Sequence, residues 1–220
     1  GEWGTANTGV VTFRPLEQTT GYPYNMDLSP DNTQLVIKIT YHNTKRYSIY
    51  DATTFAHVED VSLGDIAYGT NSRDVVWADE NTLFVLDENQ GIVQITKSDS
   101  WSTATHSILT PIADLYSSLQ YLDITSNGQT LGITTANAFF LVDVNSGNTV
   151  KQFGDAGASG YTDGDATTSR FYSVRGIAFS ADATANSGYA YVAEYSNRRI
   201  RKIDLSTNMV STLAGTGSSG

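Results

Sequence analysis

The apolar positions of the chain fall into short alternating runs that are separated by polar turns. One pattern recurs: an apolar strand, a turn rich in Asp, Asn, Ser or Gly, and a second apolar strand. It stands at residues 25–37, 74–86 and 122–133, and a fourth copy begins at residue 176 and resumes at residue 189. Such alternation predicts β-strands, and no stretch shows the sustained 3.6-residue period of a helix. We therefore expect an all-β chain with few helices.

The last apolar residue before each turn marks a repeat of about 50 residues. These anchor positions are Leu28, Trp77, Ile124 and Phe179. A third strand follows each pair, and a more polar fourth strand follows the third. Four short antiparallel strands per unit predict a β-propeller, in which each four-stranded sheet, or blade, is stable only when stacked on its neighbours. A β-sandwich, the alternative, would not repeat the four-strand cycle in order.

The sequence thus predicts one propeller or propeller segment over residues 1–220. We place the four blades at about 24–63, 73–110, 119–153 and 174–213, and an extra strand at residues 9–14. The end of the chain, residues 214–220, repeats the pattern of residues 154–160, which leads into a further unit. We therefore expect the ring to close between the termini, or to be completed by more of a longer chain or by a partner chain, since open blade edges invite strand addition.

Composition narrows the classes of partner. The chain has 13 Lys and Arg residues against 23 Asp and Glu residues, a formal net charge of −10. This balance opposes attraction to nucleic acid and to anionic lipid. The chain has no cysteine, which excludes disulfides and thiolate metal sites. No apolar run reaches the roughly 18 to 20 residues of a membrane span, so we expect no membrane insertion.

The fourth unit carries several linked motifs. They are Asp163-Gly164, Ser169-Arg-Phe171, Val174-Arg-Gly-Ile-Ala178, Tyr191-Val-Ala-Glu194 and Asn197-Arg-Arg-Ile-Arg-Lys-Ile203. In this order they resemble the NHL repeat, a family of β-propellers, over residues 154–215, whereas residues 24–153 resemble it only in strand pattern. Ser169, Val174 and Glu194 replace the Ala, Pro and Asp of the family pattern and suggest a divergent branch. The resemblance implies a fold and no particular chemistry.

The resemblance also implies structural roles between blades for five residues. Asp163 and Gly164 would form the turn between blades, with Asp accepting backbone N–H bonds and Gly supplying a positive φ. Arg170 and Phe171 would fix one blade against the next, Arg170 by bridging to a carboxylate or to backbone carbonyls, and Gly176 belongs to the same motif set. The style of this unit is similar to repeats in large secreted or surface proteins, which implies an extracellular or cell-surface location.

Two carboxylates in a Gly-rich loop, Asp163 and Asp165, are candidate ligands for a calcium ion. The same carboxylates suit a turn, and the roughly six to eight oxygen ligands that calcium takes are not visible in the sequence. The three histidines, His42, His57 and His106, stand at unrelated strand positions, so we expect them on the surface rather than at a shared metal. We therefore expect no cofactor.

No catalytic motif supports an enzyme. The chain contains no Gly-x-Ser-x-Gly, no His-Glu-x-x-His and no P-loop. The main hypothesis is a non-enzymatic interaction or structural module, whose partner is another protein, further copies of the chain or the remainder of a longer chain. A propeller hydrolase or lyase with a metal on the axis and a glycan-binding propeller are the alternatives.

Four residues are candidates for an interaction surface. Arg198 and Arg199 lie in the only dense basic run, beside Tyr195. Some members of the family bind RNA through basic faces, but the net charge argues against RNA here. Trp101 stands in a polar loop, residues 98–103, and is predicted to be an exposed anchor for a protein or a glycan. Trp77, at an anchor position, is predicted to be buried.

Overall fold

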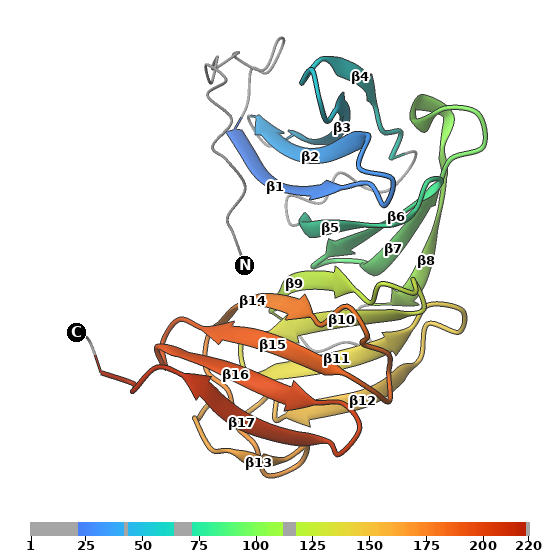
Figure 1. The fold of residues 1–220 in the computed structure, drawn as a ribbon. Helices are drawn as coiled ribbons and strands as arrows, with labels where there is room; N and C mark the ends of the chain where they lie inside the picture. Colours follow the sequence, from blue (N-terminus) through green and yellow to red (C-terminus); the bar gives the residue numbers. More distant parts are fainter. Residues whose placement is uncertain (1–21, 42–43, 64–71, 112–117, 219–220) are drawn as a thin grey trace, which may run out of the picture.

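The computed structural model describes residues 22–41, 44–63, 72–111 and 118–218 (Figure 1). These residues form four antiparallel sheets and one short 3-10 helix, which confirms the all-β prediction. The extra strand predicted at residues 9–14 lies outside the described residues, as does His42. Within the described ranges, no helix is long and apolar enough to cross a membrane.

Each sheet is built from strands that are consecutive in the chain. The first sheet contains β1 (Tyr22–Leu28), β2 (Gln34–Tyr41), β3 (Thr44–Asp51) and β4 (His57–Asp60). The second contains β5 (Ser72–Asp79), β6 (Thr82–Asp87), β7 (Gly91–Thr96) and β8 (Thr105–Pro111), with the 3-10 helix η1 (Trp101–Thr103) between its last two strands. The third contains β9 (Leu119–Ile124), β10 (Thr130–Thr135), β11 (Ala138–Asp143) and β12 (Thr149–Gly154).

The fourth sheet contains β14 (Val174–Phe179), β15 (Tyr189–Glu194), β16 (Arg199–Asp204) and β17 (Met209–Ala214). A two-residue strand, β13 (Gly164–Asp165), pairs with β17 and adds a fifth strand. Aspartates close several hairpins by accepting hydrogen bonds from backbone N–H groups two and three residues ahead. Asp51, for example, accepts from Thr53 and Thr54 after β3. This turn chemistry explains why the Asp-, Ser- and Thr-rich segments separate the strands.

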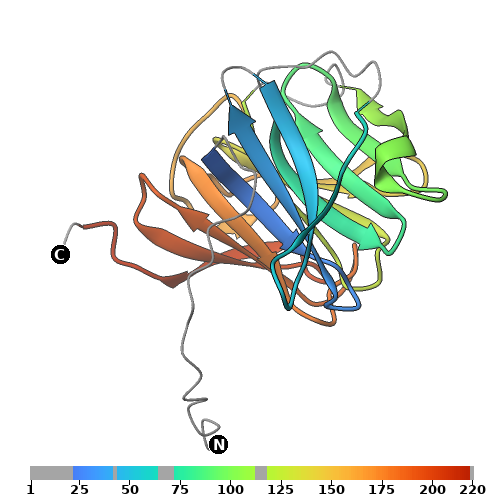
Figure 2. The ribbon, with the colours of Figure 1, turned by 90° about the horizontal axis from the view of Figure 1, so that it is seen from above.

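The sheets follow one another in an arc, with their first strands side by side. β5 packs against β1, β9 against β5, and β14 against β9 (Figures 1 and 2). Three apolar clusters fill the spaces between successive sheets. Representative members are Trp77 between the first and second sheets, Phe84 between the second and third, and Phe171 between the third and fourth. Each junction is therefore a sheet-to-sheet core.

Trp101 does not have the predicted exposure. Its side chain is fully buried, and its ring meets that of Trp77 edge-on with the ring centroids 5.2 Å apart. The short helix η1 turns the indole into the cluster between the first two sheets and leaves the polar neighbours Ser102 and Thr103 exposed. The prediction of Trp101 as an exposed anchor is wrong. Trp77 is buried at 3% exposure, as predicted.

Candidate functional site

An aspartate of the first strand joins each sheet to the next. In β1, the Oδ1 atom of Asp27 accepts a hydrogen bond from the N–H of Leu28 at 2.9 Å, and its Oδ2 atom accepts one from the N–H of Trp77 in β5 at 2.8 Å. One carboxylate therefore binds a donor of its own strand and a donor of the neighbouring sheet. We call this arrangement a carboxylate clasp.

The same clasp recurs at the other two junctions. Asp74 of β5 accepts from its own neighbour Val75 at 3.0 Å and from Leu122 of β9 at 2.9 Å. Asp123 of β9 accepts from Ile124 at 2.8 Å and from Phe179 of β14 at 3.1 Å. In the fourth sheet, Ala178 and Gly176 stand at the strand positions that match these aspartates. The series of clasps therefore ends at β14.

The clasps hold carboxylates in an environment of low polarity. Burial raises the pKa of Asp27 and of Asp74 above the ordinary value, although the hydrogen bonds from the neighbouring N–H groups oppose the shift. Burial raises the pKa of Asp123 further, to about 6, and the charges of Asp27 and Asp74 add to the shift. A group whose pKa is raised by folding stabilises the fold most when it is protonated.

We predict that Asp123→Asn changes how stability depends on pH. In the unchanged chain, the contribution of Asp123 is complete below the pKa of an unfolded aspartate, about 3.9, and is lost as the pH rises through about 6. Between pH 4 and pH 7, the free energy of unfolding should therefore fall more steeply in the wild type than in the variant. Urea denaturation at four pH values measures both slopes. Asp99→Asn, which removes an exposed carboxylate, is the control; parallel wild-type and Asp123→Asn curves would contradict the prediction.

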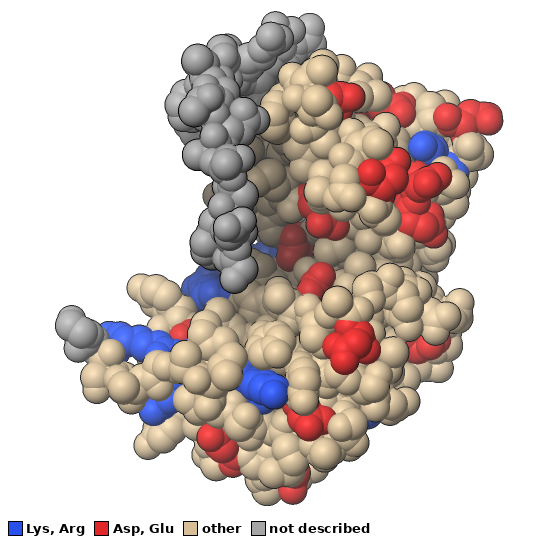
Figure 3. Space-filling model, viewed as in Figure 1, with Lys and Arg blue, Asp and Glu red and all other residues tan. Residues whose placement is uncertain are grey.

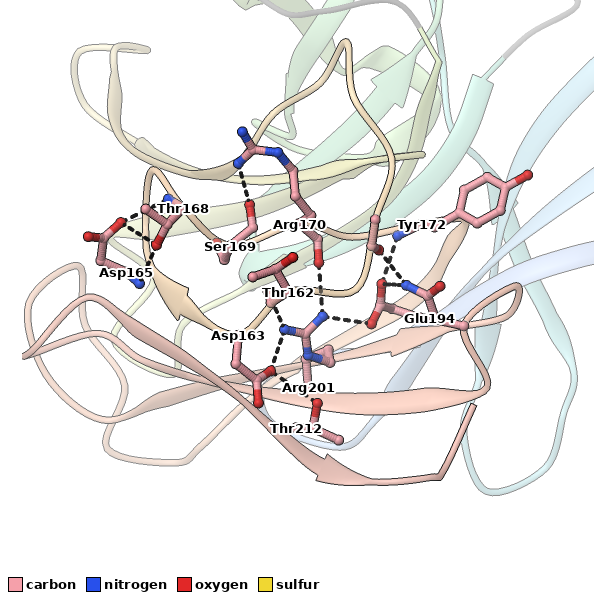
Figure 4. Close-up of polar contacts among 12 residues, drawn as sticks. Thr162, Asp163, Asp165, Thr168, Ser169, Arg170, Tyr172, Glu194, Arg201 and Thr212 are labelled. Carbon is pink, nitrogen blue, oxygen red and sulfur yellow. Dashed lines mark hydrogen bonds and ion pairs between the residues drawn. The ribbon is translucent and has the colours of Figure 1, made fainter. Parts of the chain in front are cut away.

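Arg201 of β16 is the centre of a buried polar network beside the third junction (Figure 4). Its side chain is fully buried, and its Nη1 atom donates to Glu194 Oε2 at 3.0 Å and to the carbonyl of Arg170 at 2.9 Å. Its Nη2 atom donates to Asp163 Oδ1 at 2.6 Å and to the carbonyl of Thr162 at 2.9 Å. Arg201 thus ties the loop before β14 to β15 and β16.

Glu194 completes this network from β15. Its Oε1 atom accepts from the N–H of Tyr172 at 2.7 Å and from the side-chain amide of Asn197 at 2.6 Å. Asn197 also donates to the carbonyl of Gly160 at 2.6 Å. Each polar partner here is a fixed structural contact, so the network organises the loop 155–173 and leaves no carboxylate oxygen of Glu194 facing an open site.

The predicted calcium ligands take part in structural contacts. Asp163 pairs with Arg201 and accepts from Thr212 Oγ1 at 3.0 Å. Asp165 closes the next turn, where hydrogen bonds from Thr168 and Thr167 lower its pKa to about 2. Across the ranges that the structure describes, no group of three or more His, Asp or Glu side chains is arranged to hold a metal ion. His57 is exposed and contacts Asp60 at 3.0 Å, while His106 lies apart from it in β8.

The structure places the other four residues that were expected between blades as follows. Gly164 has a φ of 146°, and a Cβ there would clash with the side chain of Thr168. Phe171 is fully buried in the apolar cluster between the third and fourth sheets. Arg170 donates to the carbonyls of Thr167 and Ser169, both at 2.7 Å, within its own loop. Its side chain therefore reaches backbone carbonyls, as predicted, but those of its own loop, and its guanidinium points away from the network of Arg201 (Figure 4). Gly176 lies at a bulge of β14.

Three of the four candidates for an interaction surface, Tyr195, Arg198 and Arg199, lie at one end of the fourth sheet. Tyr195 is 74% exposed and has the guanidinium of Arg175 at 6.0 Å from its ring centroid. Tyr161 is 63% exposed and has Arg199 at 4.8 Å in the same arrangement. Arg198 is exposed beside them. We call these five residues the Arg–Tyr surface.

Two of these five residues, Arg175 and Tyr161, were not candidates from the sequence. Their pairing with Tyr195 and Arg199 brings together segments that are distant along the chain, so no local pattern reveals it. The clasps were also missed, although Asp27 and Asp123 each stand one residue before an anchor, which is a signal visible in two units. Asp74 stands three residues before its anchor, and this offset hides the repeat.

Comparisons with known proteins identify similar folds. No family model and no curated protein matches the chain. Among solved structures, a protein of unknown function from Bacteroides thetaiotaomicron superposes with a TM-score of 0.68 at 19% identity, covering 87% of this chain and 47% of that one. An auxiliary nutrient binding protein from the same organism superposes with a TM-score of 0.64 at 15% identity, covering 88% of this chain and 47% of that one.

These similarities concern the fold alone, because the identities are low. The chain spans about half the length of each of these two structures. The structural comparison therefore supports the arc of four sheets and leaves the activity to be argued from the surface of this chain.

Proposed function

We propose that the chain is a segment of a β-propeller that acts as a non-enzymatic protein-interaction module in an extracellular or surface assembly. Support for the propeller comes from the order of strands within each sheet and from the clasp that recurs at three junctions. The motifs of the fourth unit, which resemble NHL repeats, agree with this architecture. The proposal for function depends on the Arg–Tyr surface.

The chemistry of the Arg–Tyr surface suits a protein partner. Exposed tyrosines with arginines over their rings provide a rigid, amphipathic contact area, and Tyr and Arg are enriched where protein interfaces gain most of their binding energy. The carbonyls of Thr216 and Gly217 accept hydrogen bonds from Arg199 and Arg198, which positions both side chains. The basic character of this surface, in a chain of net charge −10, selects a partner with acidic groups on the contacting side.

Glycan binding is a second candidate. Exposed tyrosines can stack on sugar rings, and the chain exposes Tyr161, Tyr195 and, in the loop before β14, Tyr172, which is 48% exposed. One of the similar solved structures is an auxiliary nutrient binding protein. Trp101 no longer supports this candidate, because it is buried.

We predict that binding of a protein ligand depends on the Arg–Tyr surface. The immobilised chain is probed with a library of purified extracellular proteins and with a glycan array, and each hit is titrated against Tyr195→Ala and Arg199→Ala. We expect protein hits whose affinity falls at least about tenfold in both variants, which corresponds to about 1.4 kcal/mol. Val150→Ala, on an exposed position of β12, is the control.

Three other outcomes would contradict the proposal. Glycan hits that are sensitive to Tyr195→Ala, without protein hits, would favour the glycan-binding candidate. Turnover of ester or lactone substrates after addition of divalent metal ions would favour a hydrolase. Protein hits that are equally strong for the wild type and both variants would place the contact elsewhere on the chain.

A further inference from the structure

In each sheet, one residue from each of the first three strands pairs with the next across the strands, and the three side chains lie on the same face. We call these three residues the junction row; in the first three sheets this face is turned toward the following sheet. The four rows are Asp27, Val36 and Ile49; Val76, Phe84 and Gln94; Asp123, Gly132 and Leu141; and Ala178, Tyr191 and Lys202. In the first three sheets the row is covered by the following sheet, as the clasps and the three apolar clusters show.

The third junction shows how closely a row is covered. The side chains of Ile177 and Phe179 of β14 pack directly on Gly132 of β10. They lie so close that a Cβ at Gly132 would come within 2.6 Å of both side chains. A first strand therefore inserts two alternate apolar side chains over the row of the preceding sheet. Trp77 and Val75 of β5, which stand at the matching positions, are buried in the same way at the first junction.

The junction row of the fourth sheet lacks such a cover in the described structure. Ala178 is exposed, and Tyr191 and Lys202 are only partly buried. Lys202 lies over the ring of Tyr189 with its Nζ atom 3.6 Å from the centroid, and Ile200 is exposed on the same face. Figure 3 shows the molecule from the side on which the fourth sheet lies in front, and this face is mostly uncharged.

The first sheet has the complementary feature. Met26 and Leu28 of β1 stand at the positions of Ile177 and Phe179, yet they are 69% and 42% exposed. Ile37 and Tyr50, on the same face of the sheet, are buried, so Met26 and Leu28 are more exposed than the apolar residues beside them in β2 and β3. The exposure of β1 matters for a further junction, because in each described junction the first strand of one sheet packs on the first and second strands of the preceding sheet.

We propose that the chain associates head to tail with a second copy of itself, with β1 of one copy on β14 and β15 of the other. This inference rests on the propeller architecture proposed above. Met26 and Leu28 would cover Ala178 and Tyr191, in the way that Ile177 and Phe179 cover Gly132. Within one chain the two surfaces stay apart, since a hollow separates the first sheet from the fourth (Figure 3). The contact is of the heterologous kind, which builds rings or filaments.

The contact differs from the internal junctions in two respects. Ala178 and Gly176 replace the clasp aspartates, so the incoming strand receives no carboxylate from β14. Tyr191 and Lys202 also replace the apolar Phe84 and Leu141 of the earlier rows, which gives the face the amphipathic character of an interface between proteins. The association is therefore reversible and depends on concentration.

Sedimentation velocity over a hundredfold range of concentration tests the proposal. For the wild type, we expect the average mass to rise with concentration. Met26→Asp places a charge on the exposed face of β1, and Tyr191→Asp places a charge in the junction row of the fourth sheet. Each substitution should weaken association at least tenfold. A mixture of the two variants should form dimers that grow no further, because it contains one intact surface of each kind. Val150→Asp, on an exposed position of β12, is the control and should associate as the wild type does.

Three results would overturn the proposal. A wild type that stays monomeric excludes the second copy, and so does a mixture of the two variants that fails to form dimers. Association abolished by Tyr191→Asp but unchanged by Met26→Asp would indicate a symmetric contact of two fourth sheets. Thermal melting of each variant verifies folding. Tyr195 and Arg199 are unchanged in all these proteins, so a monomeric wild type would leave the test of the Arg–Tyr surface intact.

Discussion

Arg201→Ala should destabilise the chain by about 3–5 kcal/mol, the range for removing one partner of a buried ion pair. The substitution leaves the carboxylate of Glu194 fully buried with only neutral donors, Tyr172 N–H and the Asn197 amide. It also removes the hydrogen bond from Arg201 to the carbonyl of Arg170 and one of the two hydrogen bonds to the carbonyl of Thr162, which still accepts from the N–H of Arg170. Urea denaturation followed by tryptophan fluorescence and by circular dichroism measures the free energy of unfolding.

Two comparisons separate this effect from a general loss of charge. Arg199→Ala removes an arginine on the same strand whose side chain is partly exposed, and should change stability by less than about 1 kcal/mol. In the double variant Arg201→Met with Glu194→Leu, no buried unpaired charge remains, because Asp163, the other carboxylate that pairs with Arg201, is half exposed; part of the lost stability should therefore return. A double variant that is as unstable as the sum of its single variants would show that the pair is not the source of the effect.

Much of the fold is predictable because it depends on local patterns. Alternation of apolar residues and Asp- and Ser-rich turns indicate the strands, and the recurring anchors Leu28, Trp77, Ile124 and Phe179 indicate four equivalent units. These signals lie within a few residues of one another along the chain. The four antiparallel sheets of the structure follow the same order.

The site residues are harder to predict because their partners are distant in sequence. Arg170 and Arg201 are both arginines in the motifs of the fourth unit, but only Arg201 lies on a strand face that is buried against the loop. Strand alternation predicts on which face of the sheet Arg201 lies, but it does not predict that the loop before β14 covers that face. Trp101 shows the converse: its neighbours are polar, yet the chain turns the indole inward at η1.

Phe171→Ala should destabilise the chain by about 3–5 kcal/mol, since it removes a fully buried aromatic ring from the junction of the third and fourth sheets. The ring lies against Gly154 of β12, where a Cβ would come within 2.7 Å of Phe171 Cδ2. Arg201 lies over the ring, with its guanidinium carbon 5.2 Å from the centroid. The cavity would therefore open between two sheets and beneath the buried ion pair.

The position of this cavity allows a sharper test than stability alone. Hydrogen exchange should accelerate in β12, β15 and β16, which border the ring, and stay unchanged in β2 and β3 of the first sheet. Tyr172→Ala is the matched control, because its side chain is 48% exposed and its N–H bond to Glu194 comes from the backbone. Equal and small losses of stability for Phe171→Ala and Tyr172→Ala would contradict the role of Phe171, whereas uniform acceleration in all four sheets would show that they unfold as one unit.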